Sequence, residues 1–156
     1  MSKSVDHLFF SILRQQMMNK RIWIGFVTVF VTTQIIEGLV GFILLGPIYS
    51  HLPHIWRPIE EIKLWMMPVT GAFFSFFFVF IFSKGYEGKG LLEGVRYGTY
   101  AALMIVLPHA YNSYATLQIP YSVALQWFLS GTLEYILAGT LLSAAFQLTG
   151  NSSSSA

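Results

Sequence analysis

Two glutamates are the residues whose type and position most clearly suggest chemistry. Glu37 lies about 15 residues into one long apolar stretch, and Glu134 lies about 13 residues into another. A carboxylate at the centre of a membrane costs about 2.5–3.5 kcal/mol on insertion scales, so it is usually paired, protonated or used. If the two stretches are neighbouring helices, the carboxyl groups lie at similar depth. The pair therefore predicts a polar site inside the membrane.

Three further polar side chains are candidates for the same site. His109 and Asn112 lie in a third apolar stretch, and Gln34 lies one turn before Glu37. Two carboxylates and a histidine that converge in a dry bundle could bind a divalent metal, of unknown identity, or relay protons. The alternative is that each glutamate is protonated or hydrogen-bonded across helices and only fixes how those helices pack.

Other kinds of chemistry lack the residues that they need. The chain has no cysteine, which excludes disulfides, thiolate metal sites and thiol redox chemistry. Haem held by two histidines needs both at one depth, but only His109 lies inside an apolar stretch, so haem is not expected. The formal charge of +2 is too small to indicate nucleic-acid binding. No nucleophile and base form a recognisable pair, and no catalytic residue is predicted.

The elements that carry these residues must cross a membrane. Of 156 residues, 54% are apolar and only 10% are charged, whereas a soluble domain carries about 25% charge. A membrane-spanning helix needs about 20 mostly apolar residues, and four stretches satisfy this, at about 22–46, 62–83, 95–117 and 121–148. They predict one all-α domain over residues 1–148, an up-down-up-down bundle of four helices. Residues 149–156 are expected to form a polar disordered tail.

The ends and loops predict an orientation. Residues 4–18 are expected to form a short amphipathic helix on the membrane surface. The N-terminal segment and the loop 84–96 together carry seven Lys and Arg residues, whereas the loop 47–63 carries two. Because positive charge is enriched on the cytoplasmic side, we expect both termini there and residues 47–61 outside.

Two segments are candidates for contact with a partner protein. Residues 47–61 contain three prolines, two histidines and two aromatic residues, and we expect them to fold back onto the outer ends of the helices. Residues 71–82 contain seven phenylalanines, so part of that helix must face lipid or another protein. The alternatives are a simple helix stop and plain lipid exposure. The candidate contact residues are His51, His54, Trp56, Arg57, Phe76, Phe77 and Phe80.

Small residues predict which helices pack together. Gly38 and Gly41 lie in the first span, and Gly139 lies in the fourth. Glycine lets helix backbones approach closely. We therefore expect the first and fourth helices to be in contact, which would bring Glu37 and Glu134 together.

Three stretches carry a family resemblance. They are FSKGYEGKGLLEGVRYG (82–98), IPYSVALQW (119–127) and GTLEYILAG (131–139). Together they resemble an uncharacterised family of small bacterial four-span integral membrane proteins, and the likeness extends over about residues 22–148. It implies a four-helix fold and a bacterial inner membrane, but it implies no activity. His109 lies outside the three stretches.

These patterns leave two main functions open. The first is a non-catalytic accessory subunit that docks on a larger membrane complex, for example an energy-transducing one, or that associates with itself. The second is a small proton- or metal-coupled transporter or binding protein that uses the intramembrane carboxylates. A lipid-binding protein or membrane enzyme is a third, and it would need a lateral pocket with convergent polar groups.

Overall fold

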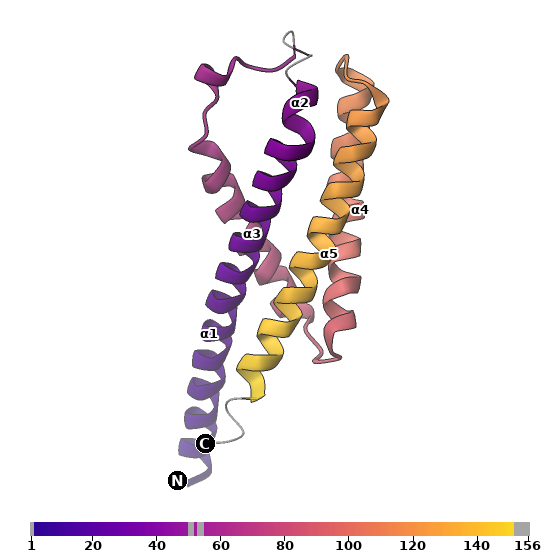
Figure 1. Ribbon diagram of the computed structural model, residues 1–156. Coiled ribbons are helices and arrows are strands. Elements are labelled where there is room, and N and C mark those ends of the chain that lie inside the picture. The colour runs from indigo at the N-terminus through magenta and orange to yellow at the C-terminus, as the bar shows by residue number, and fades with distance from the viewer. Residues whose placement is uncertain (1, 50–51, 53–54, 152–156) are drawn as a thin grey trace.

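The computed structural model is built from helices, with short loops between α3 and α4 and between α4 and α5 and a longer connection before α3 (Figure 1). It describes the backbone of residues 2–49, 52 and 55–151, and the side chains of residues 20–49, 52, 55–58 and 60–150. Its long helices run alternately up and down: α1 (Ser2–Leu39), α3 (Met66–Gly85), α4 (Leu91–Thr116) and α5 (Tyr121–Asn151). No strand occurs among the described residues. The all-α fold class that the sequence predicts is confirmed.

Three helical segments are long and apolar enough to cross a membrane, as expected of a membrane protein. They are Lys20–Tyr49, Met66–Gly85 and Tyr121–Gly150, within the part of the chain that the structure describes. Helix α4 is not among them, although the sequence predicts a span at 95–117. It lies beside α5, its most extensive packing partner (Figure 1).

The first helix corrects two predictions. Residues 4–18 do not form a separate amphipathic helix, because α1 begins at Ser2 and continues unbroken into the first apolar stretch. No proline or glycine occurs before Gly25 to interrupt the helical hydrogen bonds. The predicted stop at Gly46-Pro47 is also wrong. A π-helical segment (Val40–Leu45) leads directly into the short helix α2 (Gly46–Tyr49), so the helical run continues through Pro47. Local π-helical adjustment is one way in which a membrane helix accommodates a proline.

The other helices differ from their predicted bounds by a few residues. Helix α3 begins at Met66 instead of residue 62, because a 3-10 turn (Ile59–Glu61) and a further turn precede it. Helix α4 begins earlier than predicted, directly after Gly90, whose φ of 91° favours glycine. Pro108 lies inside α4 without ending it.

Glycine determines how closely α4 and α5 pack. A Cβ atom at Gly94 or Gly98 would collide with the backbone oxygen of Gly139 or Tyr135, so the two backbones touch at this level. Gly139 therefore packs on α4. The sequence had instead suggested that it packs on α1.

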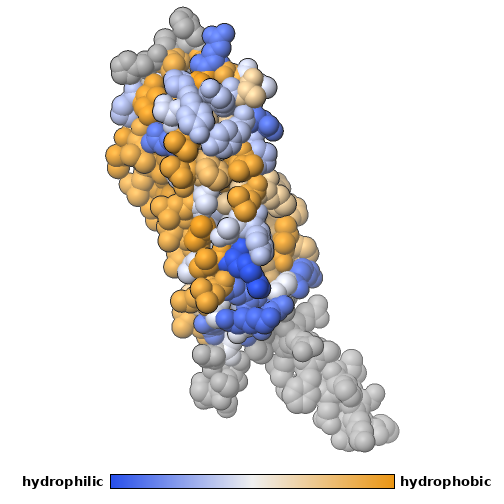
Figure 2. All heavy atoms as spheres, turned by 90° about the vertical axis from the view of Figure 1, so that its right-hand side faces the viewer, coloured by the Kyte–Doolittle hydropathy of each residue, from blue (hydrophilic) through white to orange (hydrophobic). Residues whose placement is uncertain are grey.

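Helix α1 packs on α5 and α3 through its inner part. Gly25 faces Leu142 and Phe146 of α5 and Val79 of α3. Together with α4, these helices enclose a hydrophobic core near the α3–α4 loop. Its buried residues are Val29, Phe78, Val79, Phe82, Ala101, Ala138, Leu142 and Phe146. Figure 2 shows hydrophobic residues over most of the middle of one face, with hydrophilic residues gathered towards its two ends.

Candidate functional site

The two glutamates lie on neighbouring helices. Helices α1 and α5 are in contact, and the carboxyl groups of Glu37 and Glu134 are near enough for their charges to interact. Glu37 follows Val29 and Thr33 at intervals of four residues, and those two side chains are buried. The structure nevertheless shields only one of them. Glu134 is 7% exposed, whereas Glu37 is exposed.

Two other polar side chains, Tyr135 and Thr33, lie next to these glutamates along α5 and α1. The ring of Tyr135 packs on Phe74 of α3, with ring centroids 4.9 Å apart, and lies within electrostatic range of both glutamates. The buried Thr33 hydroxyl donates a hydrogen bond to the Phe30 carbonyl oxygen at 3.1 Å. Neither contact involves the carboxyl group of Glu134.

Two buried polar side chains on the α1–α3 contact have no hydrogen-bond partner among the described residues. They are Gln34, through Oε1, and Ser75, through Oγ. Gln34 lies against Gly71 of α3, and Ser75 lies one turn further along that helix, fully buried. Sequence reasoning identified Gln34 but missed Ser75. The available signal was a hydroxyl inside a run of phenylalanines, one turn after a glycine.

The structure does not bring His109 or Asn112 to the glutamates. The exposed ring of His109 stacks on Trp127, with centroids 5.4 Å apart. Trp127 precedes Glu134 by seven residues, so His109 lies about 10 Å along α5 from Glu134. Asn112 is exposed and lies one turn further away. Among the described side chains, at residues 20–49, 52, 55–58 and 60–150, no group of three His, Cys, Asp or Glu residues could hold a metal ion.

His109 instead belongs to an aromatic cluster at the end of the bundle remote from the termini. The Trp127 indole N–H donates to the Tyr49 hydroxyl at 2.7 Å, and Trp56 stacks on Tyr49 with centroids 4.2 Å apart. The connection between α2 and α3 therefore folds back through Trp56 onto the ends of α2 and α5, as the sequence predicts. Trp56 is engaged within the chain, whereas Arg57 is exposed. The predicted contact residues His51 and His54 lie outside the described residues.

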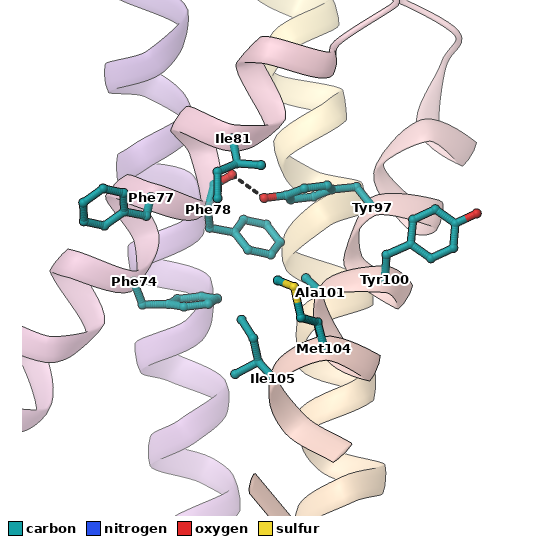
Figure 3. A pocket seen from close by; sticks show the side chains of 9 residues that line it. All are labelled: Phe74, Phe77, Phe78, Ile81, Tyr97, Tyr100, Ala101, Met104 and Ile105. Carbon is teal, nitrogen blue, oxygen red and sulfur yellow. Dashed lines mark hydrogen bonds between the residues drawn. The ribbon is translucent and has the colours of Figure 1, made fainter. Parts of the chain in front are cut away.

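The phenylalanines of α3 divide between two environments. Phe78 and Phe82 are buried, whereas Phe76, Phe77 and Phe80 are exposed. Phe76 and Phe80 stack on each other, with centroids 6.2 Å apart. Between α3 and α4 lies a groove of about 190 Å³ (Figure 3), lined by Phe74, Phe77, Phe78, Ile81, Tyr97, Tyr100, Ala101, Met104 and Ile105.

The loop that closes one end of this groove is ordered by a buried carboxylate. Glu93 accepts hydrogen bonds from the backbone N–H groups of Glu87 at 2.6 Å and Lys89 at 2.9 Å. The Ser143 hydroxyl donates to the Gly90 carbonyl oxygen at 2.9 Å, which ties the loop to α5. The exposed Glu87 pairs with Lys89, and this contact holds the pKa of its carboxyl group below its ordinary value. The sequence predicts an i,i+3 pair of Glu93 with Arg96, but it does not predict these two backbone hydrogen bonds.

Comparison with protein-family models, with curated proteins and with solved structures gives no match. The resemblance to a bacterial four-span family therefore remains a prediction, and the function must be inferred from this chain's own residues.

Proposed function

We propose that this chain is a small non-catalytic membrane subunit that docks on another membrane protein through residues 35–44 of its first span, the α1 docking face. The observation that carries the proposal is that no side chain of this stretch is buried, although it lies within a helix apolar enough to cross a membrane. Glu37 lies in it, and a carboxyl group that faces lipid is costly. A protein that covers this face would remove that cost.

The shape of the α1 docking face suits a second helix. At Gly38 and Gly41 no atom lies within 4 Å of the position that a Cβ would take, and small residues let membrane helices approach closely. The π-helical segment begins here, and such segments are frequent at functional sites. The expected partner helix carries a Lys, Arg, His or amide side chain at the depth of Glu37, because such a group would donate to its carboxyl group.

The proposal includes the placement in the membrane. Four spans are supported by the packing of α4 along α5. Figure 1 shows the beginning of α1, the end of α5 and the α3–α4 loop towards one end of the molecule, and the segments there carry most of the Lys and Arg residues. This distribution favours cytoplasmic termini, and the family resemblance favours a bacterial inner membrane. The partner is a larger membrane complex, and the exposed Arg57, Phe76 and Phe80 add to the contact surface.

A second candidate function uses the same glutamates as a proton relay. It is favoured by the position of Glu37 and Glu134 on the contacting helices α1 and α5, within electrostatic range of each other. The exposed carboxyl group of Glu37 and the buried one of Glu134 would then form two successive stations.

Site-specific photo-cross-linking in cells tests the docking face. A benzophenone amino acid replaces Phe42, which is 85% exposed on this face, or Leu133, which is 59% exposed on α5 and serves as the matched control. We expect one discrete adduct with another membrane protein from position 42 and none from position 133. Gly41→Trp should weaken that adduct about tenfold, because an indole would occupy the space in which a helix backbone packs.

Three outcomes would argue against docking on a larger complex. A lone monomer with no adduct would overturn the proposal. An adduct with the mass of two copies would replace the larger complex with self-association. Proton flux through vesicles that contain only this purified chain, lost in Glu134→Gln, would favour the relay.

A further inference from the structure

The groove between α3 and α4 is separate from the α1 docking face and is almost entirely apolar. Its lining residues are hydrophobic or aromatic. The Tyr97 hydroxyl is directed away from the opening, because it donates to the Phe78 backbone oxygen at 2.7 Å (Figure 3). In the same view Phe74 and Phe78 lie across from Ala101 and Ile105. The groove therefore offers an apolar occupant close contact and no hydrogen bond.

The size of the groove selects a single hydrocarbon chain over a helix. Its volume is about 190 Å³, somewhat larger than the ~150 Å³ cavity that is known to bind benzene. This volume suits a segment of about six to eight carbon atoms. An α-helix with side chains is about 10–12 Å across, so it could cover the groove but not enter it.

The direction and length of the groove match one leaflet of a bilayer. Its lining on α4 runs from Tyr97 to Ile105, which is about 12 Å along the helix axis at 1.5 Å per residue. Half of the hydrocarbon core of a bilayer is about 15 Å thick. An acyl chain that lies parallel to α4 would therefore reach from the loop end of the groove towards the middle of the membrane.

The charges at the loop end define the headgroup. Lys84, Lys89 and Arg96 are exposed there, against the exposed Glu87. The fifth charged residue, Glu93, is turned inward and is occupied by two backbone N–H groups. Arg96 lies one turn before Tyr100, a lining residue, on the loop side. The net positive charge complements an anion, and a guanidinium group can bind phosphate through two parallel hydrogen bonds.

The geometry points to a binding site for one anionic phospholipid, with an acyl chain in the α3–α4 groove and the headgroup phosphate at Arg96. A side chain that fills the groove should displace the acyl chain. A change that removes only the rim charge should leave the chain in place but abolish the preference for an anionic headgroup.

Native mass spectrometry of the full chain in detergent tests this site, with an equimolar mixture of dioleoyl phosphatidylglycerol and dioleoyl phosphatidylcholine. The groove variant is Met104→Trp. Met104 lines the groove, and it is 69% exposed, so a larger side chain can occupy the groove without disturbing the core. Its matched control is Leu133→Trp, on the outer surface of α5. The rim variant is Arg96→Gln.

We expect one phosphatidylglycerol per chain, retained about tenfold over phosphatidylcholine. Met104→Trp should reduce that retention about tenfold, and Leu133→Trp should leave it unchanged. Arg96→Gln should bring the ratio of the two lipids close to one. Equal retention of both lipids by the unmodified chain would overturn the headgroup assignment. Equal losses in the two tryptophan variants, or a mass of two copies that only Met104→Trp removes, would overturn the groove as a lipid site.

Discussion

Glu93 shows how one buried carboxylate orders a connection. Its two oxygens accept the backbone N–H groups of Glu87 and Lys89, and a hydrogen bond to a charged group contributes about 1.5–3 kcal/mol. We expect Glu93→Ala to lower the free energy of unfolding by about 2–4 kcal/mol, because two N–H groups lose their acceptor. Glu93→Gln should cost less, since one acceptor oxygen remains. Denaturant unfolding in detergent measures both.

Glu87→Gln is the matched control. The ion pair of Glu87 with Lys89 is exposed, and such pairs contribute little to stability. The pKa of Glu87 is lowered in the folded chain, so any contribution of the pair is present at neutral pH and is lost as the pH falls through that lowered value. No measurable change is expected for this variant. A loss equal to that of Glu93→Ala would contradict the role assigned to Glu93.

The glycines of the helices differ in how closely a neighbouring helix approaches them. A Cβ atom at Gly98 would collide with the Tyr135 backbone oxygen, whereas one at Gly41 would meet no atom within 4 Å. We expect Gly98→Ala to lower the free energy of unfolding by about 1–3 kcal/mol, because α4 and α5 must separate.

Gly41→Ala provides the comparison under the same unfolding conditions. It should leave stability unchanged or raise it by about 0.5–1 kcal/mol, because alanine loses less backbone entropy in a helix. Equal destabilisation by the two substitutions would show that α4 and α5 do not pack through Gly98.

Labelling from the two sides of the membrane shows which helices of the whole chain cross it. The chain has no cysteine, so single cysteines at Lys89, Arg57 and Gln118 can be labelled from either side without background. We expect position 89 to react with a membrane-impermeant maleimide from the cytoplasmic side, as the distribution of positive charge indicates. Positions 57 and 118 should react from the opposite side, because α3 and α4 each lead away from the α3–α4 loop.

The decisive position is Gln118, between α4 and α5. If it reacts from the same side as position 89, α4 does not cross the membrane, and the four-span arrangement fails. The other two positions report on α3 independently of that outcome.

Much of the fold could be predicted from runs of similar residues and from the residues that end them. The all-α class and the approximate range of each long helix follow from local hydropathy, and each depends only on residues that are neighbours in the chain. The predicted stop at Gly46-Pro47 was wrong, because a membrane helix can continue through a proline with local π-helical adjustment. The contact between α1 and α5 was also predicted, although Gly38 and Gly41, which suggested it, do not take part.

Local hydropathy is enough to place two carboxyl groups deep in apolar helices, but it does not reveal that their surroundings differ. The packing of the helices buries Glu134 and leaves Glu37 exposed. It also brings His109 to an aromatic cluster and not to the glutamates. The reason is physical. Hydropathy is a property of each segment, whereas the burial of a side chain depends on which surfaces of separate helices fit together. Here that fit depends on close backbone contacts at Gly94, Gly98 and Gly139, whose distances no single helix can specify.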